Sequence, residues 1–290
     1  MLLKKRVSLV LDGILLGAVL YLFLFGRFFP YSPLTLGFKH KEFARSVVYF
    51  HKGADISRFS DVDKLIPGVE AFHQLKYKHK VAIFLCSSLS EKKRFTSSEA
   101  RMTTFPPFGR IFVSLQAQQD ALNNKIHIDV YLKHELSHAL LEQNMSFWRF
   151  SRFPRWLLEG IAMYSADQMG VDGYYTKAQV EKYIQAGYFV YPGDWGRKFT
   201  KIPAIQNLPL ADKYYFTYSQ YGYIVQDLIE KYGREKFLVF LDKELRSGTV
   251  ENNFQDTFGQ GLGDYMEGFR ENSAGRNDNE IAGTIHRTKL

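Results

Sequence analysis

The pattern of hydrophobic and polar positions predicts short strands in the first part of the chain. Compact apolar runs rich in β-branched and aromatic residues predict strands at residues 46–50, 81–86 and 110–115. Apolar residues at helical spacing predict a helix over residues 60–75, with Ser60 and Asp63 as a capping pair. The polar stretch 87–109 contains Pro106-Pro107, so we expect a long loop there.

The second half of the chain has mostly helical patterns. A Thr-x-x-Gln capping box at Thr176 opens one of these helices, and Gly187 follows its end. Residues 188–212 are predicted to be irregular, and the polar residues 273–290 are predicted to be a disordered tail. The predicted helices cover residues 129–141, 156–164, 176–186, 214–232, 235–246, 250–258 and 264–272. The expected fold class is α+β: a small antiparallel or mixed sheet, then a helix pair and a mostly helical C-terminal half.

The N-terminus carries an apolar run that predicts a membrane anchor. Basic residues within 1–6 precede a stretch over 7–27 that is close to the roughly 20 residues needed to cross a bilayer. No small-residue cleavage site follows it, so we expect an uncleaved, single-pass signal anchor, with a cleaved secreted form as the alternative. The basic residues should remain cytoplasmic, which places a juxtamembrane linker at 28–43 and a domain at 44–272 outside the cytoplasm.

Composition narrows the classes of function. The 290 residues are 46% hydrophobic, which is ample for one substantial globular domain. The net charge of +8 is scattered and no nucleic-acid motif is present, so nucleic acid is not an expected partner. A membrane surface suits this charge better. The single cysteine, Cys86, excludes an intramolecular disulfide, and its apolar neighbours predict a buried structural thiol.

The most informative motif is His134-Glu135-Leu136-Ser137-His138. Residues four apart on a helix project from the same face, so both imidazoles can bind one zinc ion. Glu135 can then reach the water that the metal activates and act as its general base. The flanking apolar residues support a helix, with Asp129 as a plausible N-cap.

A catalytic zinc site usually has three protein ligands, and Glu159 is the candidate for the third. It lies in the apolar run Trp156–Tyr164, which follows a possible helix start at Pro154. An unpaired carboxylate in such a run is costly, and a metal removes that cost. Antiparallel helices joined by a loop around residues 145–153 would bring Glu159 back to the two histidines.

The motif His-Glu-x-x-His, followed about twenty residues later by Trp-Leu-x-Glu-Gly-x-Ala, resembles the gluzincin metallopeptidases, specifically the peptidase MA-like proteins. It is also similar to motifs of thermolysin and aminopeptidase N. The resemblance covers roughly residues 80–270 and implies His134, His138 and Glu159 as ligands and Glu135 as base. It also implies that strand 110–115 is a sheet edge that pairs with peptide substrates; a fully paired core strand is the alternative. Met163 stands where thermolysin-like enzymes have an Asp that orients a ligand His, so the groups supporting the ligands are unassigned.

Two further segments are candidates for a role in the site. Related enzymes use a Tyr or His to donate to the developing oxyanion, and the resemblance implies Tyr218 for this role, with Tyr221 as second choice. The alternative is that both tyrosines are packing residues. Phe147–Trp156 alternates aromatic residues with arginines, which suits a membrane interface, although such a loop can also pack on its own domain.

Together these patterns predict a membrane-anchored zinc metallopeptidase with an extracytoplasmic catalytic domain. The aminopeptidase motif Gly-x-Met-Glu-Asn is absent from the sequence, so we expect an endopeptidase that acts on peptide or protein substrates. The alternative is a catalytically silent, zinc-stabilised binding module at the membrane. Glu135 argues against that alternative, because metal ligation alone does not need a base. The sequence does not indicate an oligomeric state.

Overall fold

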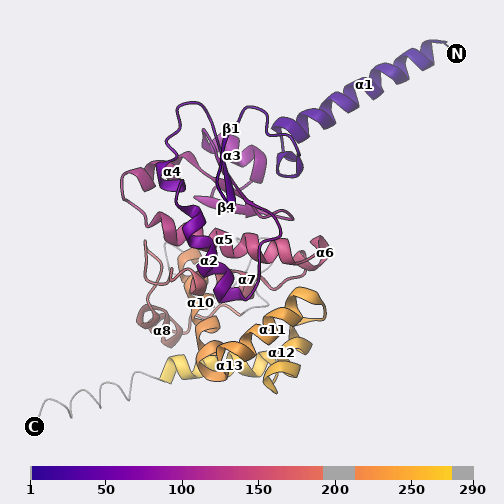
Figure 1. Ribbon diagram of the computed structural model, residues 1–290. Helices are drawn as coiled ribbons and strands as arrows, with labels where there is room; N and C mark the ends of the chain where they lie inside the picture. Colours follow the sequence, from indigo (N-terminus) through magenta and orange to yellow (C-terminus); the bar gives the residue numbers. More distant parts are fainter. Residues whose placement is uncertain (1, 192–212, 276–290) are drawn as a thin grey trace, which may run out of the picture. The chain divides into compact units, whose positions relative to one another are not determined.

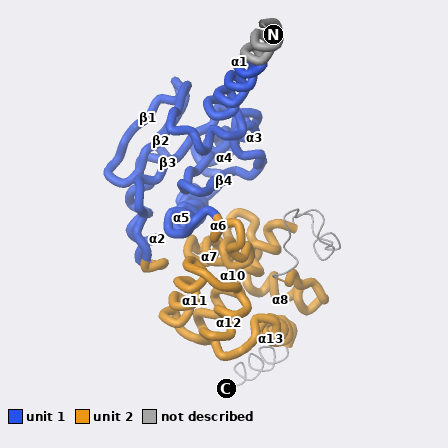
Figure 2. The backbone as a smooth tube through the Cα atoms, turned by 90° about the vertical axis from the view of Figure 1, so that its right-hand side faces the viewer, with its two compact units in different colours: residues 1–71, 75–147 blue, residues 72–74, 148–290 orange. Residues whose placement is uncertain are grey.

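The computed structural model describes residues 2–191 and 213–275 (Figure 1). The chain divides into two compact units, residues 1–71 with 75–147 and residues 72–74 with 148–290 (Figure 2). The predicted domain at 44–272 therefore contributes to both units. The predictions for residues 192–212 and for the tail beyond residue 275 lie outside the described residues.

The first unit contains a five-stranded mixed sheet in the order β1-β2-β3-β5-β4. Strands β2, β3 and β5 run parallel, whereas β1 and β4 each pair antiparallel at the two edges. The three predicted strands are confirmed as β2, β3 and β5. The strands are β1 Lys39–Glu42, β2 Ser46–Phe50, β3 Val81–Leu85, β4 Met102–Phe105 and β5 Arg110–Val113.

The structure corrects the prediction for residues 87–109, which are not one long loop. They contain helix α3, Leu89–Thr96, which is capped by the Ser88 side chain accepting from the Glu91 N–H, and the edge strand β4. The prediction that strand 110–115 is a sheet edge is also wrong, because β4 pairs with β5 on its outer side. Similarly, the predicted linker at 28–43 contains β1.

The predicted helices are present, with small differences at their ends. The capping box of Thr176 and Gln179 is confirmed. Asp129 is not an N-cap, because α5 already begins at Ile128 and His127 holds the N-cap position. Asp63 does not pair with Ser60 as predicted; its carboxylate accepts from the Arg45 N–H and from the Ser46 hydroxyl. Besides α3, the helices are α1 Leu2–Phe25, α2 Val62–His73, α4 Leu115–Leu122, α5 Ile128–Asn144, α6 Phe147–Phe150, α7 Arg155–Ser165, α8 Lys177–Gln185, α10 Lys213–Tyr232, α11 Arg234–Arg246, α12 Val250–Phe258 and α13 Leu262–Gly275.

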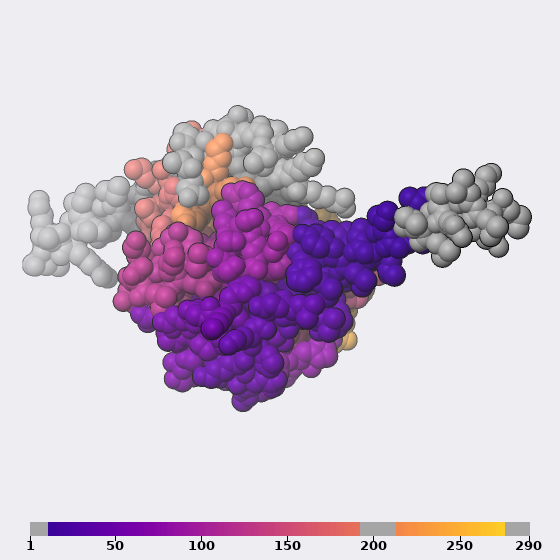
Figure 3. All heavy atoms as spheres, turned by 90° about the horizontal axis from the view of Figure 1, so that it is seen from above, coloured from indigo at the N-terminus to yellow at the C-terminus, as the bar shows by residue number. Residues whose placement is uncertain are grey.

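Helix α1 occupies the segment for which a membrane anchor is predicted. From residue 11 onward most of its large apolar side chains are exposed, including Ile14 and Leu15 at 65% each. Figure 3 shows indigo atoms of this N-terminal segment at the surface of the face in view. Within the described residues, no helix has both the length and the apolar character that crossing a bilayer requires.

A buried polar network connects the sheet to helix α5. Glu70 on α2 is 2% exposed, and its carboxylate accepts from the Arg45 guanidinium, the Lys76 ammonium and the Tyr77 N–H. The hydrogen bond from Arg45 lowers the Glu70 pKa to about 2. The buried Tyr77 hydroxyl donates to the Leu136 carbonyl over 2.7 Å. This chain of contacts reaches the middle of α5, where the two motif histidines lie.

Helix α5 also lies in close contact with the turn between β4 and β5. Gly109 in this turn has φ +62, and a Cβ added to it would be 2.8 Å from the Cα and the carbonyl oxygen of Ala139. Because real Cβ atoms do not approach so closely, only glycine allows the turn to pack against this helix. Gly109 therefore sets how closely α5 packs on the sheet.

We expect Gly109→Ala to lower the free energy of unfolding by about 2–5 kcal/mol. The left-handed backbone costs an L-residue about 1–2 kcal/mol, and overpacking against Ala139 adds about 1–3 kcal/mol. Gly53→Ala is the matched control, because Gly53 has φ +89 but nothing lies within 4 Å of an added Cβ. Denaturant unfolding should therefore give the larger loss at position 109. Equal losses would show that contact with α5 contributes nothing.

Candidate metal centre

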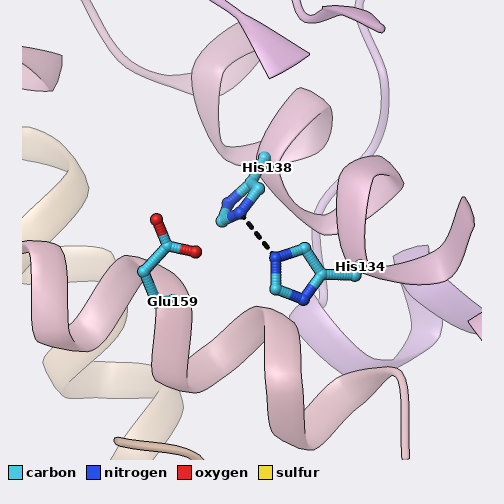
Figure 4. A group of neighbouring side chains, drawn as sticks. All are labelled: His134, His138 and Glu159. Carbon is cyan, nitrogen blue, oxygen red and sulfur yellow. Dashed lines mark hydrogen bonds between the residues drawn. The ribbon is translucent and has the colours of Figure 1, made fainter. Parts of the chain in front are cut away.

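Helix α5 holds His134 and His138 on one face, as their spacing predicts. Their Nε2 atoms lie 3.0 Å apart, and their rings are nearly perpendicular at 86° (Figure 4). Two imidazole nitrogens bound tetrahedrally to one zinc ion, each 2.0–2.1 Å from it, would be about 3.3 Å apart. The pair therefore has close to the separation that a shared metal requires. Both residues are buried, at 7% and 8% exposure.

Helix α7 carries Glu159 in its second turn. Pro154 forms the N-cap of α7, as the predicted helix start implies, and Glu159 is only 4% exposed. The guanidinium of Arg155, a half-exposed side chain, lies 3.7 Å from Oε1 of Glu159. Gly160 explains why glycine follows the glutamate: a Cβ there would be 2.5 Å from the Tyr221 carbonyl oxygen on α10. The backbone of α7 therefore packs directly against α10.

The three predicted ligands form one buried group. One ligand atom from each of His134, His138 and Glu159 can be chosen so that all lie within 4.8 Å of one another (Figure 4). Burying a carboxylate beside two imidazoles is unfavourable without compensating charge, and a cation among them supplies it. The donor set and its spacing could therefore hold a metal ion.

Glu135 points toward the sheet rather than into solvent. It is 8% exposed, and its Oε2 accepts a hydrogen bond of 2.6 Å from the Thr104 hydroxyl on β4. The same hydroxyl lies 3.1 Å from the Glu135 carbonyl oxygen. Sequence reasoning missed Thr104, because it lies in the segment predicted to be a loop. The only pattern that could have predicted β4 was the alternation of apolar and polar residues at 102–105, and four residues are short even for a strand.

A buried lysine lies near this carboxylate. Lys92 on α3 is 0% exposed, and its ammonium donates to the Thr103 hydroxyl over 2.8 Å and to the Ser98 carbonyl over 3.3 Å. Burial lowers the Lys92 pKa to about 8, while the charge of Glu135 opposes that shift. Lys92 could not be identified from the sequence, since lysine at a helical position ordinarily faces solvent.

The two tyrosines proposed as oxyanion donors differ in exposure. Tyr218 on α10 is half-buried, with its ring 6.4 Å from that of Tyr174. Tyr221, the second choice, is 0% exposed and lies where α10 packs against Gly160. The difference in exposure does not decide between the two tyrosines. The role of Tyr218 stays a prediction.

The segment Phe147–Trp156 is partly buried and partly exposed. Arg149 donates to the Glu244 carboxylate over 2.6 Å and to the Gly248 carbonyl over 2.8 Å, while Trp156 is buried. Trp148, by contrast, is 72% exposed. The buried contacts of Arg149 and Trp156 agree with a segment that packs on its own domain, whereas contact with a membrane stays a prediction.

Cys86 is a buried thiol, as predicted. It is 1% exposed at the end of β3, and burial raises its pKa to about 12. Burial and the raised pKa both disfavour the thiolate, which agrees with a structural role.

Comparison with known proteins identifies the family. The family model of the peptidase MA superfamily matches residues 95–272, more than half of the 290 residues. This match includes Glu135 and the three residues of the buried group. A comparison with curated proteins gives no match. The matched range, with the geometry of its two motifs, shows that the chain belongs to the peptidase MA superfamily, in agreement with the gluzincin-like resemblance of its sequence.

Proposed function

We propose that the protein is a zinc metallopeptidase that hydrolyses peptide bonds, with His134, His138 and Glu159 as the metal ligands. The observation that carries this proposal is the buried group formed by these three residues. The proposed base, Glu135, directly follows the ligand His134 in the sequence. Two imidazoles and one carboxylate are a donor set typical of catalytic zinc, which leaves a position open for water or substrate. Membership of the peptidase MA superfamily supports the same class of reaction.

A zinc ion in this group would supply Lewis-acid polarisation of a water molecule and of the scissile carbonyl. Glu135 accepts the proton of the attacking water and then delivers it to the departing amine. His134 and His138 serve as neutral nitrogen donors, and Glu159 contributes the charge of its carboxylate. Tyr218 is our candidate for a second donor to the developing oxyanion.

We propose that the substrate is an extended peptide that pairs with the outer edge of β4. This strand is the last in the sheet order, and none of the strands that the structure describes pairs with its outer backbone groups. Adding a strand satisfies such groups and aligns a peptide by its main chain. Thr104 of β4 contacts Glu135, so this edge lies beside the proposed base. Main-chain pairing does not need a free terminus, which supports endopeptidase action.

The proposed ligand set predicts the metal content of its variants. The full-length protein in detergent should bind one zinc ion per chain, as measured by elemental analysis of the purified protein. His134→Ala, His138→Ala and Glu159→Gln should each weaken zinc binding sharply in a chelator competition, because each removes one of three ligands. Arg155→Gln is the control, since Arg155 is half-exposed and only adjoins Glu159. Wild-type zinc affinity in Glu159→Gln would exclude Glu159 as a ligand.

A second prediction separates zinc binding from hydrolysis. Glu135→Ala should keep the zinc and the cooperative unfolding transition, but turnover of a peptide library should fall by about 100-fold or more, because the general base is lost. Mass spectrometry of the cleavage products would measure the turnover. An equally active Glu135→Ala protein would refute the proposed role of Glu135. A wild-type protein that holds zinc but cleaves no peptide would instead support the silent binding module.

We also propose that residues 7–27 anchor the protein in a membrane, with residues 1–6 in the cytoplasm and the chain that follows the anchor outside it. Support comes from the exposed apolar side chains of α1 from residue 11 onward and from the basic residues Lys4, Lys5 and Arg6. The protein should remain in the membrane fraction after alkaline washing, and external protease should digest the region after residue 30. A mature chain that begins near residue 27 would establish the cleaved, secreted form.

A further inference from the structure

The hydroxyl of Thr104 makes a short contact with the carboxylate of Glu135. Oγ1 lies 2.6 Å from Oε2 of Glu135, and Thr104 is at the third position of the edge strand β4. The register pairs Thr104 with Ile111 of β5, whose side chain is 0% exposed. The hydroxyl is therefore presented from a strand that is fixed in the sheet, rather than from a flexible loop.

The hydroxyl can donate only one hydrogen, so its two possible acceptors compete. The Glu135 carbonyl oxygen is 3.1 Å away, whereas the carboxylate oxygen is 2.6 Å away. The Glu135 carbonyl lies within α5 and can accept an N–H from the following turn of that helix. A charged acceptor at the shorter distance forms the stronger bond. The Thr104 hydrogen therefore belongs to the carboxylate.

The bond restricts a side chain that would otherwise be mobile. A glutamate has three rotatable side-chain bonds, and holding it in one rotamer costs up to about 1.5–2 kcal/mol of conformational entropy. Because Oε2 accepts the hydrogen bond from Thr104, we take Oε1 as the carboxylate oxygen that accepts the proton of the attacking water. A base placed in advance of the reaction does not need to be ordered when the substrate arrives.

The neighbouring Thr103 is not part of this arrangement. Its hydroxyl accepts from the buried Lys92 ammonium over 2.8 Å and lies 3.0 Å from the Ser98 hydroxyl. Adjacent strand residues point to opposite faces, so Thr103 faces α3 while Thr104 faces α5. The two threonines therefore have separate roles.

We propose that Thr104 is a positioning residue that holds Glu135 in the orientation needed for proton transfer. The inference rests on the proposed function, in which Glu135 is the general base. It adds a specific residue outside the two motifs, and it assigns a task to the edge strand beyond main-chain pairing with a substrate.

The test compares Thr104→Val, which removes only the hydroxyl, with Thr104→Ser, which retains it. In the full-length, zinc-loaded protein, Thr104→Val should keep its zinc and its KM, while kcat falls roughly ten- to hundredfold, the scale of one lost hydrogen bond to a charged group. Thr104→Ser should retain kcat within about threefold. Thr96→Val is the matched control, because it removes a buried hydroxyl that donates to the Lys92 carbonyl and does not touch Glu135.

Binding of acetohydroxamate, measured by calorimetry, gives a readout that does not require turnover. The hydroxamate group binds a metal and shares its proton with an adjacent base, so its affinity depends on where the Glu135 carboxylate lies. Thr104→Val should bind it about tenfold more weakly than the wild type, and Thr104→Ser and Thr96→Val should bind it equally well.

The outcomes distinguish this inference from the proposed function. Wild-type kcat and hydroxamate affinity in Thr104→Val would overturn the positioning role, as would a loss of zinc in that variant alone. If Glu135→Ala is fully active, the proposed function fails instead, whatever Thr104→Val does. If the wild type cleaves no peptide, the hydroxamate affinities of the three threonine variants still decide the role of Thr104.

Discussion

Close backbone packing at two glycines is the constraint on which the candidate site depends. Within the first unit, Gly109 allows the turn after β4 to lie against Ala139 of α5. Within the second, Gly160 allows α7 to lie against the Tyr221 backbone of α10. Each glycine fixes a helix that carries candidate metal ligands. Because packed interiors cannot absorb even one extra carbon without a shift, these contacts limit where the ligand atoms can be.

Three charged side chains near the site are buried in the packed interior. Glu135, Glu159 and Lys92 are each less than a tenth exposed, although such residues are ordinarily at the surface. Glu135 accepts a hydrogen bond, and Lys92 donates two, so their charges are partly satisfied within the first unit. For Glu159, a cation shared with the two histidines would provide compensation of the same kind. Burying three charged side chains does not stabilise the fold by itself, so a role in the proposed metal-dependent hydrolysis explains their burial better.

The sequence predicted the features whose physical basis is local. The helical period places His134 and His138 on one face whatever surrounds them, and an apolar run around Glu159 signals a buried carboxylate. The strand 110–115 was found for the same reason. The place of this strand in the sheet could not be predicted, because strand pairing depends on residues that are distant in the sequence. Thr104 was missed because four residues are too few for a periodic pattern to distinguish a strand from a loop.

The edge strand β4 takes part both in the proposed pairing with the substrate and in the proposed orientation of Glu135. Its side chains alternate, so Thr104 faces α5 while Thr103 faces α3, and its outer backbone edge is left for another strand. A peptide that pairs with this edge, as we propose, would take its register from the same backbone that carries Thr104. Substrate alignment and base orientation would then share one rigid reference, the sheet. Under this arrangement a displacement of β4 would misplace the scissile bond and Glu135 together, which gives a physical reason to build the edge strand into the sheet rather than leave it as a loop.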